Sequence, residues 1–136
     1  MTPRTIGFLG AGNMAAALIK GLLHSGTIDP STLVASDVRG ERLKQLHGLH
    51  GIRTTQDNHA LVREVDVLVL SVKPQVIDKA LTLVGNDVRP DTLVISVAAG
   101  VPIAALEARL PAGTPVVRTM PNTPATVLGG VTAISA

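Results

Sequence analysis

The sequence predicts an α/β fold with a doubly wound, mostly parallel sheet and helices on both faces. Short runs rich in Val, Ile and Leu alternate with segments of helical periodicity, starting at the N-terminus. Several of these runs are apolar throughout instead of alternating, which is typical of strands buried on both faces. Repeated strand–helix alternation favours a parallel sheet, because parallel strands are joined by helical crossovers.

The predicted elements follow from these two patterns. Strands are predicted at Thr5–Leu9, Leu33–Ser36, Val67–Val72, Leu93–Val97 and Pro115–Thr119, with a weaker one at Ile52–Thr55. The first helix is predicted from one apolar stripe, Met14, Leu18 and Leu22, with Gly26 as its stop. Further helices are predicted at Arg42–His47, Asn58–Glu64, Val76–Val84 and Ile103–Leu110. The helix boundaries are marked by Pro74, Pro90, Pro102 and Pro111.

Composition limits the classes of protein that this chain can represent. With 136 residues, 46% of them apolar, it is expected to form one domain, residues 1–136, with a buried core. Cysteine is absent, which excludes disulfides and Cys-ligated metals. The longest apolar stretches, Val67–Val72 and Leu93–Val101, fall far short of the roughly 18 residues of a membrane span. Residues 1–12 lack the pattern of a secretory signal, so a cytoplasmic location is expected.

Charge argues against nucleic acid as a partner. Twelve basic residues nearly balance ten acidic ones and are spread along the chain, and Phe8 is the only aromatic residue available to stack on a base. His47 and His50 lie three residues apart, but Gly48 stands between them and no third ligand follows. We therefore predict a solvated surface there and no metal site.

A glycine pattern follows the first predicted strand. Gly10, Gly12 and Ala15 form G-x-G-x-x-A where the first helix begins. Gly10 allows a tight turn, Gly12 lets the backbone approach a diphosphate, and Ala15 lets the helix pack on the strand. The free N–H groups at a helix start suit an anion. The glycines alone are equally compatible with a plain turn, but their place in a strand–helix–strand unit predicts a Rossmann-like, dinucleotide-binding domain.

The end of the second strand is expected to meet the adenosine ribose. Asp37 favours a free 2′-hydroxyl and hence NAD, whereas Arg39 and Arg42 favour a 2′-phosphate and hence NADP. A carboxylate about 4 Å from a phosphate charge costs up to about 4 kcal/mol at an effective dielectric of about 20, so NADP requires Asp37 to turn aside. Alternatively, Arg39, Arg42 and Lys44 form a solvated helix face. These residues leave the choice of cofactor open.

Two further strand ends border the same crevice, because ligands of open parallel sheets lie across the carboxyl ends of the strands. Lys73 is placed there to meet a cofactor phosphate or a substrate carboxylate, and Pro74 restricts its turn. Ala98, Ala99 and Gly100 leave room for a ring or ribose to approach the main chain. The alternatives are a solvated lysine and ordinary packing of small residues.

A rigid polar loop is predicted after the last strand. Prolines flank Asn122 and Thr123, which excludes a helix and favours a fixed turn. Such a loop can orient a small substrate, and we predict that Met120, Pro121, Asn122 and Thr123 contact it. A structural turn is an equally compatible interpretation of this segment alone.

Four segments together resemble the pyrroline-5-carboxylate reductase family. They are Ile6–Met14 (IGFLGAGNM), Ser71–Gln75 (SVKPQ), Ser96–Val101 (SVAAGV) and Val117–Ala125 (VRTMPNTPA). The likeness covers essentially the whole chain in the family's order, and the last segment is the specific one. It implies hydride transfer from NAD(P)H to the C=N carbon of 1-pyrroline-5-carboxylate, which forms L-proline.

The resemblance also implies particular contacts. Arg39 is one expected cofactor contact. The others are Leu9, Gly10, Ala11, Gly12, Asn13, Met14, Asp37, Asn58, Ser71, Val72, Lys73, Pro74, Val97, Ala98 and Ala99. The family commonly prefers NADPH, which favours NADP with NAD as the alternative. Imine reduction needs orientation, worth about 7–11 kcal/mol, more than a nucleophile or a metal. No catalytic residue is therefore predicted.

The family further implies a second, helical domain that dimerises and completes the substrate site. The chain ends at Ala136, so by itself it is expected to bind cofactor with little or no reductase activity, and a homo-oligomer is expected when that domain is present. Gly129–Ser135 is then expected to be an exposed final strand. The alternatives are another NADP-dependent reductase of the same broad group and a non-catalytic, redox-sensing dinucleotide module.

Overall fold

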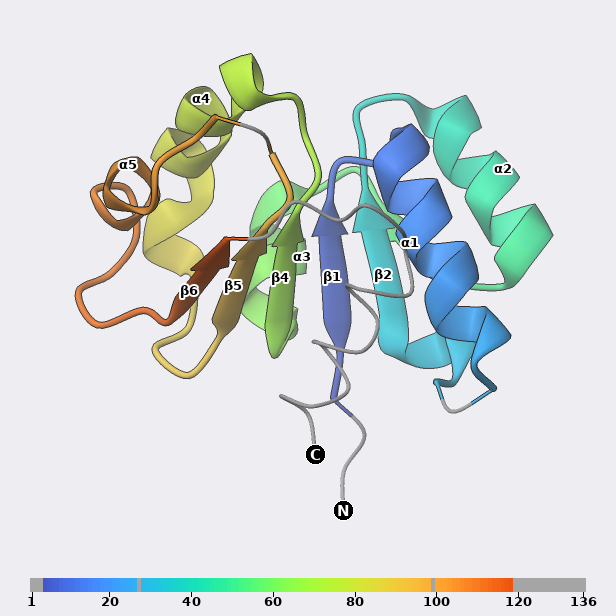
Figure 1. Ribbon diagram of the computed structural model, residues 1–136. Coiled ribbons are helices and arrows are strands. Elements are labelled where there is room, and N and C mark those ends of the chain that lie inside the picture. Colours follow the sequence, from blue (N-terminus) through green and yellow to red (C-terminus); the bar gives the residue numbers. More distant parts are fainter. Residues whose placement is uncertain (1–3, 27, 99, 119–136) are drawn as a thin grey trace.

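A computed structural model describes residues 4–26, 28–98 and 100–118 (Figure 1). Its strands are β1 (Ile6–Leu9), β2 (Leu33–Ser36), β3 (Arg53–Thr55), β4 (Val67–Leu70), β5 (Leu93–Ser96) and β6 (Val116–Arg118). They form one parallel sheet in the order β3-β2-β1-β4-β5-β6. The chain runs outward from β1 in one direction and from β4 in the other, so the switch point lies between these two strands.

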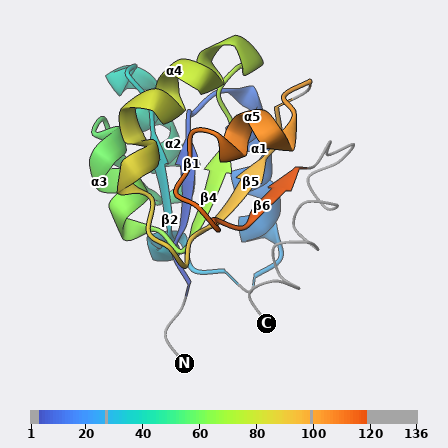
Figure 2. The same ribbon diagram turned by 90° about the vertical axis from the view of Figure 1, so that its left-hand side faces the viewer.

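Helices cover both faces of this sheet (Figure 2). They are α1 (Asn13–His24), α2 (Gly40–His50), α3 (Asn58–Glu64), α4 (Pro74–Val84) and α5 (Ile103–Glu107), with short 3₁₀ helices at Pro30–Thr32 and Gly85–Asp87. Buried residues of α1 and α2 form one core with one face of the strands, and those of α3, α4 and α5 form a second core with the other face. The predicted doubly wound α/β fold is confirmed.

Successive residues of a strand point to opposite faces of the sheet and so pack in different cores. Phe8, 1% exposed, packs on the α1 side, and its neighbour Leu9 packs on the opposite side. Gly7 lies where a Cβ atom would come within 2.6 Å of Val65 Cγ1, so a glycine is needed for α3 to approach the sheet. None of the helices in the described residues combines the length and the hydropathy that a membrane span needs.

Two predictions about the helices are wrong: one concerns the buried face of α1 and the other the end of α2. Met14 does not join the buried stripe of α1, which consists of Ala15, Leu18, Ile19 and Leu22. Helix α2 does not end at His47 but runs through Gly48 to His50. Gly51 follows as its cap, with a φ of 72° that glycine adopts easily.

Two other predicted elements are too long. Strand β4 was predicted to reach Val72 but ends at Leu70. The next two residues, Ser71 and Val72, approach the turn at Gly10 instead. Helix α5 ends at Glu107, because Arg109 and Leu110 donate to carbonyls only three residues back. In contrast, both bounds of α3 agree with the prediction.

Ala99, the loop Met120–Pro124 and the predicted strand Gly129–Ser135 lie outside the described residues.

Candidate functional site

The glycine turn between β1 and α1 packs closely against the residues that follow β4. Gly10 has a φ of 99°, and a Cβ atom there would come within 2.7 Å of Val72 Cγ1. Ser71 Oγ donates to the carbonyls of Leu9 (3.1 Å) and Gly10 (2.9 Å). The structure therefore brings Ser71 and Val72 to the turn, and it requires glycine at position 10 for both conformation and space.

Gly12 is not required by the chain's own packing. Its φ of −79° and ψ of −165° suit any residue, and a Cβ atom there would meet nothing within 4 Å. In the described chain, no hydrogen bond uses the N–H groups of Gly12, Asn13 or Met14, which lie at the positive end of α1. The turn thus presents free N–H donors beside open space, as an anionic ligand requires.

Asp37 follows β2, and its carboxylate is fully engaged. Oδ2 accepts from the Ala11 N–H (3.0 Å) and from Arg39 Nη2 (3.0 Å), and Oδ1 accepts from the Arg39 N–H (2.9 Å) and Nε (3.0 Å). The Arg39 guanidinium, supported by the two backbone N–H groups and opposed by burial, lowers the pKa of Asp37 from 3.8 to about 2. Four donors fill the four acceptor sites of a carboxylate.

A hollow of about 740 Å³ opens beside the turn. Its walls are Gly12, Asn13, Arg39, Gly40, Glu41, Arg42, Gln45 and Lys73. Arg39, Arg42 and Lys73 bring three positive charges to this hollow, against the carboxylate of Glu41 and that of Asp37, which is paired with Arg39. The net positive charge favours an anionic ligand. Lys73, from the end of β4, and Arg39, from the segment after β2, therefore line one hollow.

Arg42 makes contacts with the glycine turn that neither interpretation anticipated, and its contact with a 2′-phosphate stays a prediction. Its Nε donates to the Ala11 carbonyl (2.7 Å), its Nη2 to the Gly12 carbonyl (3.4 Å) and its Nη1 to Gln45 Oε1 (3.2 Å). It is half-buried, so the solvated-face interpretation is wrong for this residue. No sequence signal pointed to this contact, because Arg42 is 31 residues from Ala11.

The other predicted cofactor contacts vary in accessibility. Leu9 and Ala11 have buried side chains, so only their main-chain atoms face the turn, whereas Met14 is 41% exposed at the start of α1. Pro74 is exposed as the first residue of α4. Val97 and Ala98 are 8% and 5% exposed and pack in the two cores. Their contact with a cofactor stays a prediction.

Asn58 is not brought to the hollow beside the turn. It begins α3 and lines another hollow of about 480 Å³, with Gln56, Asp57, His59, Leu83 and Val84. Gln56 links the two regions, since its Nε2 donates to the Val38 carbonyl (3.0 Å) in the segment after β2. The role of this glutamine was missed, because it depends on the pairing of β2 with β3.

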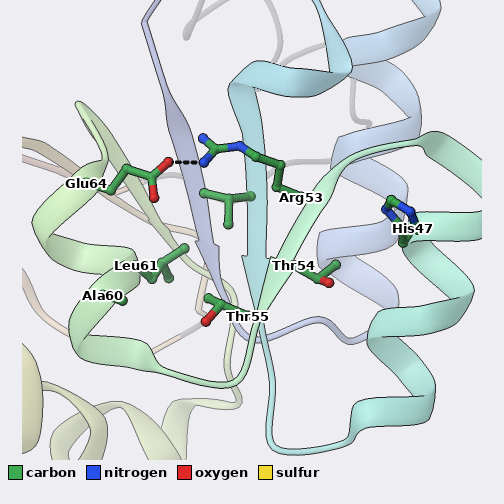
Figure 3. Close-up of a pocket in the computed structure, with 8 residues that line it drawn as sticks. His47, Arg53, Thr54, Thr55, Ala60, Leu61 and Glu64 are labelled. Atoms are coloured by element: carbon green, nitrogen blue, oxygen red, sulfur yellow. Dashed lines mark ion pairs between the residues drawn. The ribbon is translucent and has the colours of Figure 1, made fainter.

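A third hollow, of about 420 Å³, lies at the edge strand β3 (Figure 3). Arg53 and Glu64 form an ion pair across it, and Arg53 Nε also donates to the Ser31 carbonyl (2.9 Å). His47 Nδ1 lies 2.9 Å from the Ile52 carbonyl. These polar groups already have protein partners, and the glycine turn does not reach this hollow.

The sheet order, the helices on both faces and the G-x-G-x-x-A turn beside the switch point define a Rossmann-like α/β domain. The comparison with known families agrees with this class. Residues 5–100 match the family described as NADP oxidoreductase, coenzyme F420-dependent, and the chain belongs to that family.

Three relatives extend the likeness beyond residue 100. Pyrroline-5-carboxylate reductase of Methanosarcina acetivorans is 46% identical over 127 residues, which are 93% of this chain and 47% of that protein. The structure of the Coxiella burnetii pyrroline-5-carboxylate reductase has a TM-score of 0.80 at 35% identity, covering 93% of this chain and 47% of the other. The Plasmodium falciparum pyrroline carboxylate reductase with NADP bound has a TM-score of 0.76 at 26% identity, covering 93% and 45%. The chain spans about half the length of these relatives.

Proposed function

We propose that this chain is the cofactor-binding part of an NAD(P)H-dependent pyrroline-5-carboxylate reductase, which reduces a C=N bond to form L-proline. Relatives of that name align with the chain well past the end of the family match at residue 100. The observation that carries the proposal is Gly12, where a Cβ atom would meet nothing within 4 Å and where the N–H groups of Gly12, Asn13 and Met14 have no hydrogen-bond partner in the described chain. A bound, reduced nicotinamide would supply the hydride for this chemistry.

NADP is the cofactor that the charges favour. The carboxylate of Asp37 has no acceptor site left for a ribose hydroxyl, and its charge is paired with Arg39. Arg39 keeps 60% of its side chain exposed beside the hollow, and Lys73 lines the same hollow. Asp37 therefore orients a cation toward a 2′-phosphate without having to turn aside.

The residues of this chain act by binding and orientation. The N–H groups of Gly12, Asn13 and Met14 hold a diphosphate, and Ser71 supports their turn from β4. Val97, Ala98 and Ala99 are proposed to border the nicotinamide side, and Met120–Thr123 the substrate. We also propose a cytoplasmic location and, for the whole reductase, a homo-oligomer whose second half completes the substrate site.

A Gly12→Val variant tests the cofactor site. The chain has neither Trp nor Tyr, so the fluorescence of NADPH and NADH can be titrated without protein background. We expect wild type to bind NADPH more tightly than NADH. Gly12→Val should lose both, because its side chain fills the open space, while its melting temperature stays within a few degrees of wild type. Equal NADPH affinity in wild type and Gly12→Val would contradict the assignment of the turn.

The reaction is tested by a chimera in which this chain replaces the matching half of the Methanosarcina acetivorans reductase. We expect NADPH oxidation that depends on 1-pyrroline-5-carboxylate, and little or none from the chain alone. A folded chimera that binds NADPH without reducing that substrate would contradict the reductase proposal. It would favour a different reductase or a redox-sensing module.

A further inference from the structure

We propose that Arg42 is a positioning residue that holds the diphosphate-binding turn in its receptive shape, an inference that rests on the proposed function. Its guanidinium reaches from α2 to the turn that precedes α1. Nε donates to the carbonyl of Ala11 at 2.7 Å, and Nη2 donates to that of Gly12 at 3.4 Å. Nη1 is held by Gln45 Oε1 at 3.2 Å, so each guanidinium nitrogen has a protein partner.

These carbonyl contacts set the direction of the N–H donors. In a planar trans peptide, the C=O and the N–H point in opposite directions. The Ala11 carbonyl points at Arg42, so the Gly12 N–H of the same peptide points away from Arg42. The Gly12 carbonyl is related in the same way to the Asn13 N–H. Arg42 therefore directs the N–H donors of Gly12 and Asn13.

The peptide groups of Ala11 are held on both sides. Asp37 Oδ2 accepts from the Ala11 N–H at 3.0 Å, while Arg42 binds the Ala11 carbonyl. The Gly12 carbonyl also accepts from the Ala16 N–H (3.0 Å), which ties the same contact to the first turn of α1. Arg42 itself is held in place, because α2 is fixed to the sheet by the buried side chains of Leu43 and Leu46. A turn fixed before binding loses less entropy when an anion arrives.

Replacing a positioning residue and replacing a residue that contacts the 2′-phosphate should change the affinities for NADPH and NADH in different ways. A residue that contacts a 2′-phosphate affects NADPH and spares NADH, which is the behaviour expected of exposed Arg39. A residue that shapes the diphosphate turn affects both cofactors equally, since both carry the diphosphate. The ratio of the two affinities therefore separates the roles of Arg39 and Arg42.

The experiment titrates NADPH and NADH against the wild-type chain, Arg42→Met, Arg42→Lys and Arg39→Met. We expect Arg42→Met to weaken both cofactors by the same factor, about tenfold. Arg42→Lys should recover little, because a lysine ammonium lacks the planar fork that spans two carbonyls. Arg39→Met should weaken NADPH alone. Lys44→Met, which removes a cation from an exposed position of the same helix, is the control and should bind both cofactors like wild type.

Three results would overturn the inference: a loss confined to NADPH, no loss at all, or full recovery in Arg42→Lys. Amide hydrogen exchange on the ligand-free Arg42→Lys chain gives a second measurement should Arg42→Met fail to fold. Faster exchange at Ala11 and Ala16, whose N–H groups donate to Asp37 Oδ2 and to the Gly12 carbonyl, supports the positioning role, and unchanged exchange there contradicts it. If the wild-type chain binds neither cofactor, the proposed function fails, which is a separate outcome from these.

Discussion

At the scale of single residues, Gly10 and Gly12 lie in the same turn but differ in why glycine stands there. Gly10 is required by the fold, since its φ of 99° and the 2.7 Å approach to Val72 leave no room for a side chain. Gly12 has an ordinary conformation and open space around it. A glycine that the fold does not need is best explained by a ligand that approaches the main chain.

Asp37 makes folding stability depend on pH. Its pKa falls from 3.8 in the unfolded chain to about 2 in the folded one, so its contribution is fully present above about pH 4 and is lost as the pH falls toward 2. We expect the difference in the free energy of unfolding between wild type and Asp37→Asn to be larger at pH 6 than at pH 2.5, by about 1 kcal/mol after allowing for solvent screening. Urea denaturation at both pH values measures it.

Asp91→Asn, which removes an exposed carboxylate ahead of β5, is the matched control for that measurement. An equal effect of Asp37→Asn at the two pH values would show that the Asp37–Arg39 pair contributes nothing to folding.

At the scale of elements, α3 depends on its first turn and on its buried face. Seven residues are too few for a helix to be stable alone. Asp57 caps it, because Oδ1 accepts from the N–H groups of His59 (3.0 Å) and Ala60 (3.2 Å). Leu61 and Val62 then pack in the core on that face. Cap and packing together explain why both bounds of this helix could be predicted.

Replacing the cap should weaken the whole domain. We expect Asp57→Ala to lower the free energy of unfolding by about 1 kcal/mol, and Asp57→Ser to lower it by less, because a serine hydroxyl can accept the same hydrogen bonds. Chemical denaturation measures both variants. Glu107→Ala, at an exposed position of α5, is the control and should change little. A loss in Asp57→Ser as large as in Asp57→Ala would argue against capping.

At the scale of the whole molecule, the two ends of the sheet carry different groups of residues. The carboxyl ends of β1, β2 and β4 surround the glycine turn. At the amino ends, Asp66 Oδ2 accepts from the Thr5 N–H (3.0 Å) and Oδ1 accepts from Arg89 Nη2 (2.8 Å). Arg89 also donates to the Val65 carbonyl (2.7 Å). This network joins the starts of β1 and β4 to the segment before β5.

Separate ends predict that stability and binding can be changed independently. We expect Arg89→Met to lower the free energy of unfolding by about 1 kcal/mol, since the ion pair is only partly buried. NADPH affinity should stay within about twofold of wild type, because the network lies at the opposite end of the strands. Urea denaturation and NADPH titration on the same samples measure the two quantities. A tenfold loss of affinity in a stably folded Arg89→Met would contradict this separation.

Much of the fold was predictable because its signals are local. Unbroken Val, Leu and Ile runs marked strands buried on both faces, and the α3 boundaries followed from the adjacent residues. The errors in the helices arose where two local signals competed. Met14 matches the apolar period of α1 but lies at its exposed first turn, and Gly48 did not stop α2 because Gly51 supplies the left-handed residue that ends it.

The order of elements along the chain, the turn at Gly10 and Gly12, and the presence of charged residues near it could all be predicted from the amino-acid sequence. What those charges do became visible only in the folded chain: the Asp37 carboxylate is fully used by Ala11 and Arg39, and Arg42 binds the carbonyls of the turn. The difference lies in the range of the interactions. Periodicity and turn preference act over a few residues, whereas a hydrogen bond between α2 and the turn before α1 exists only after the sheet has brought them together.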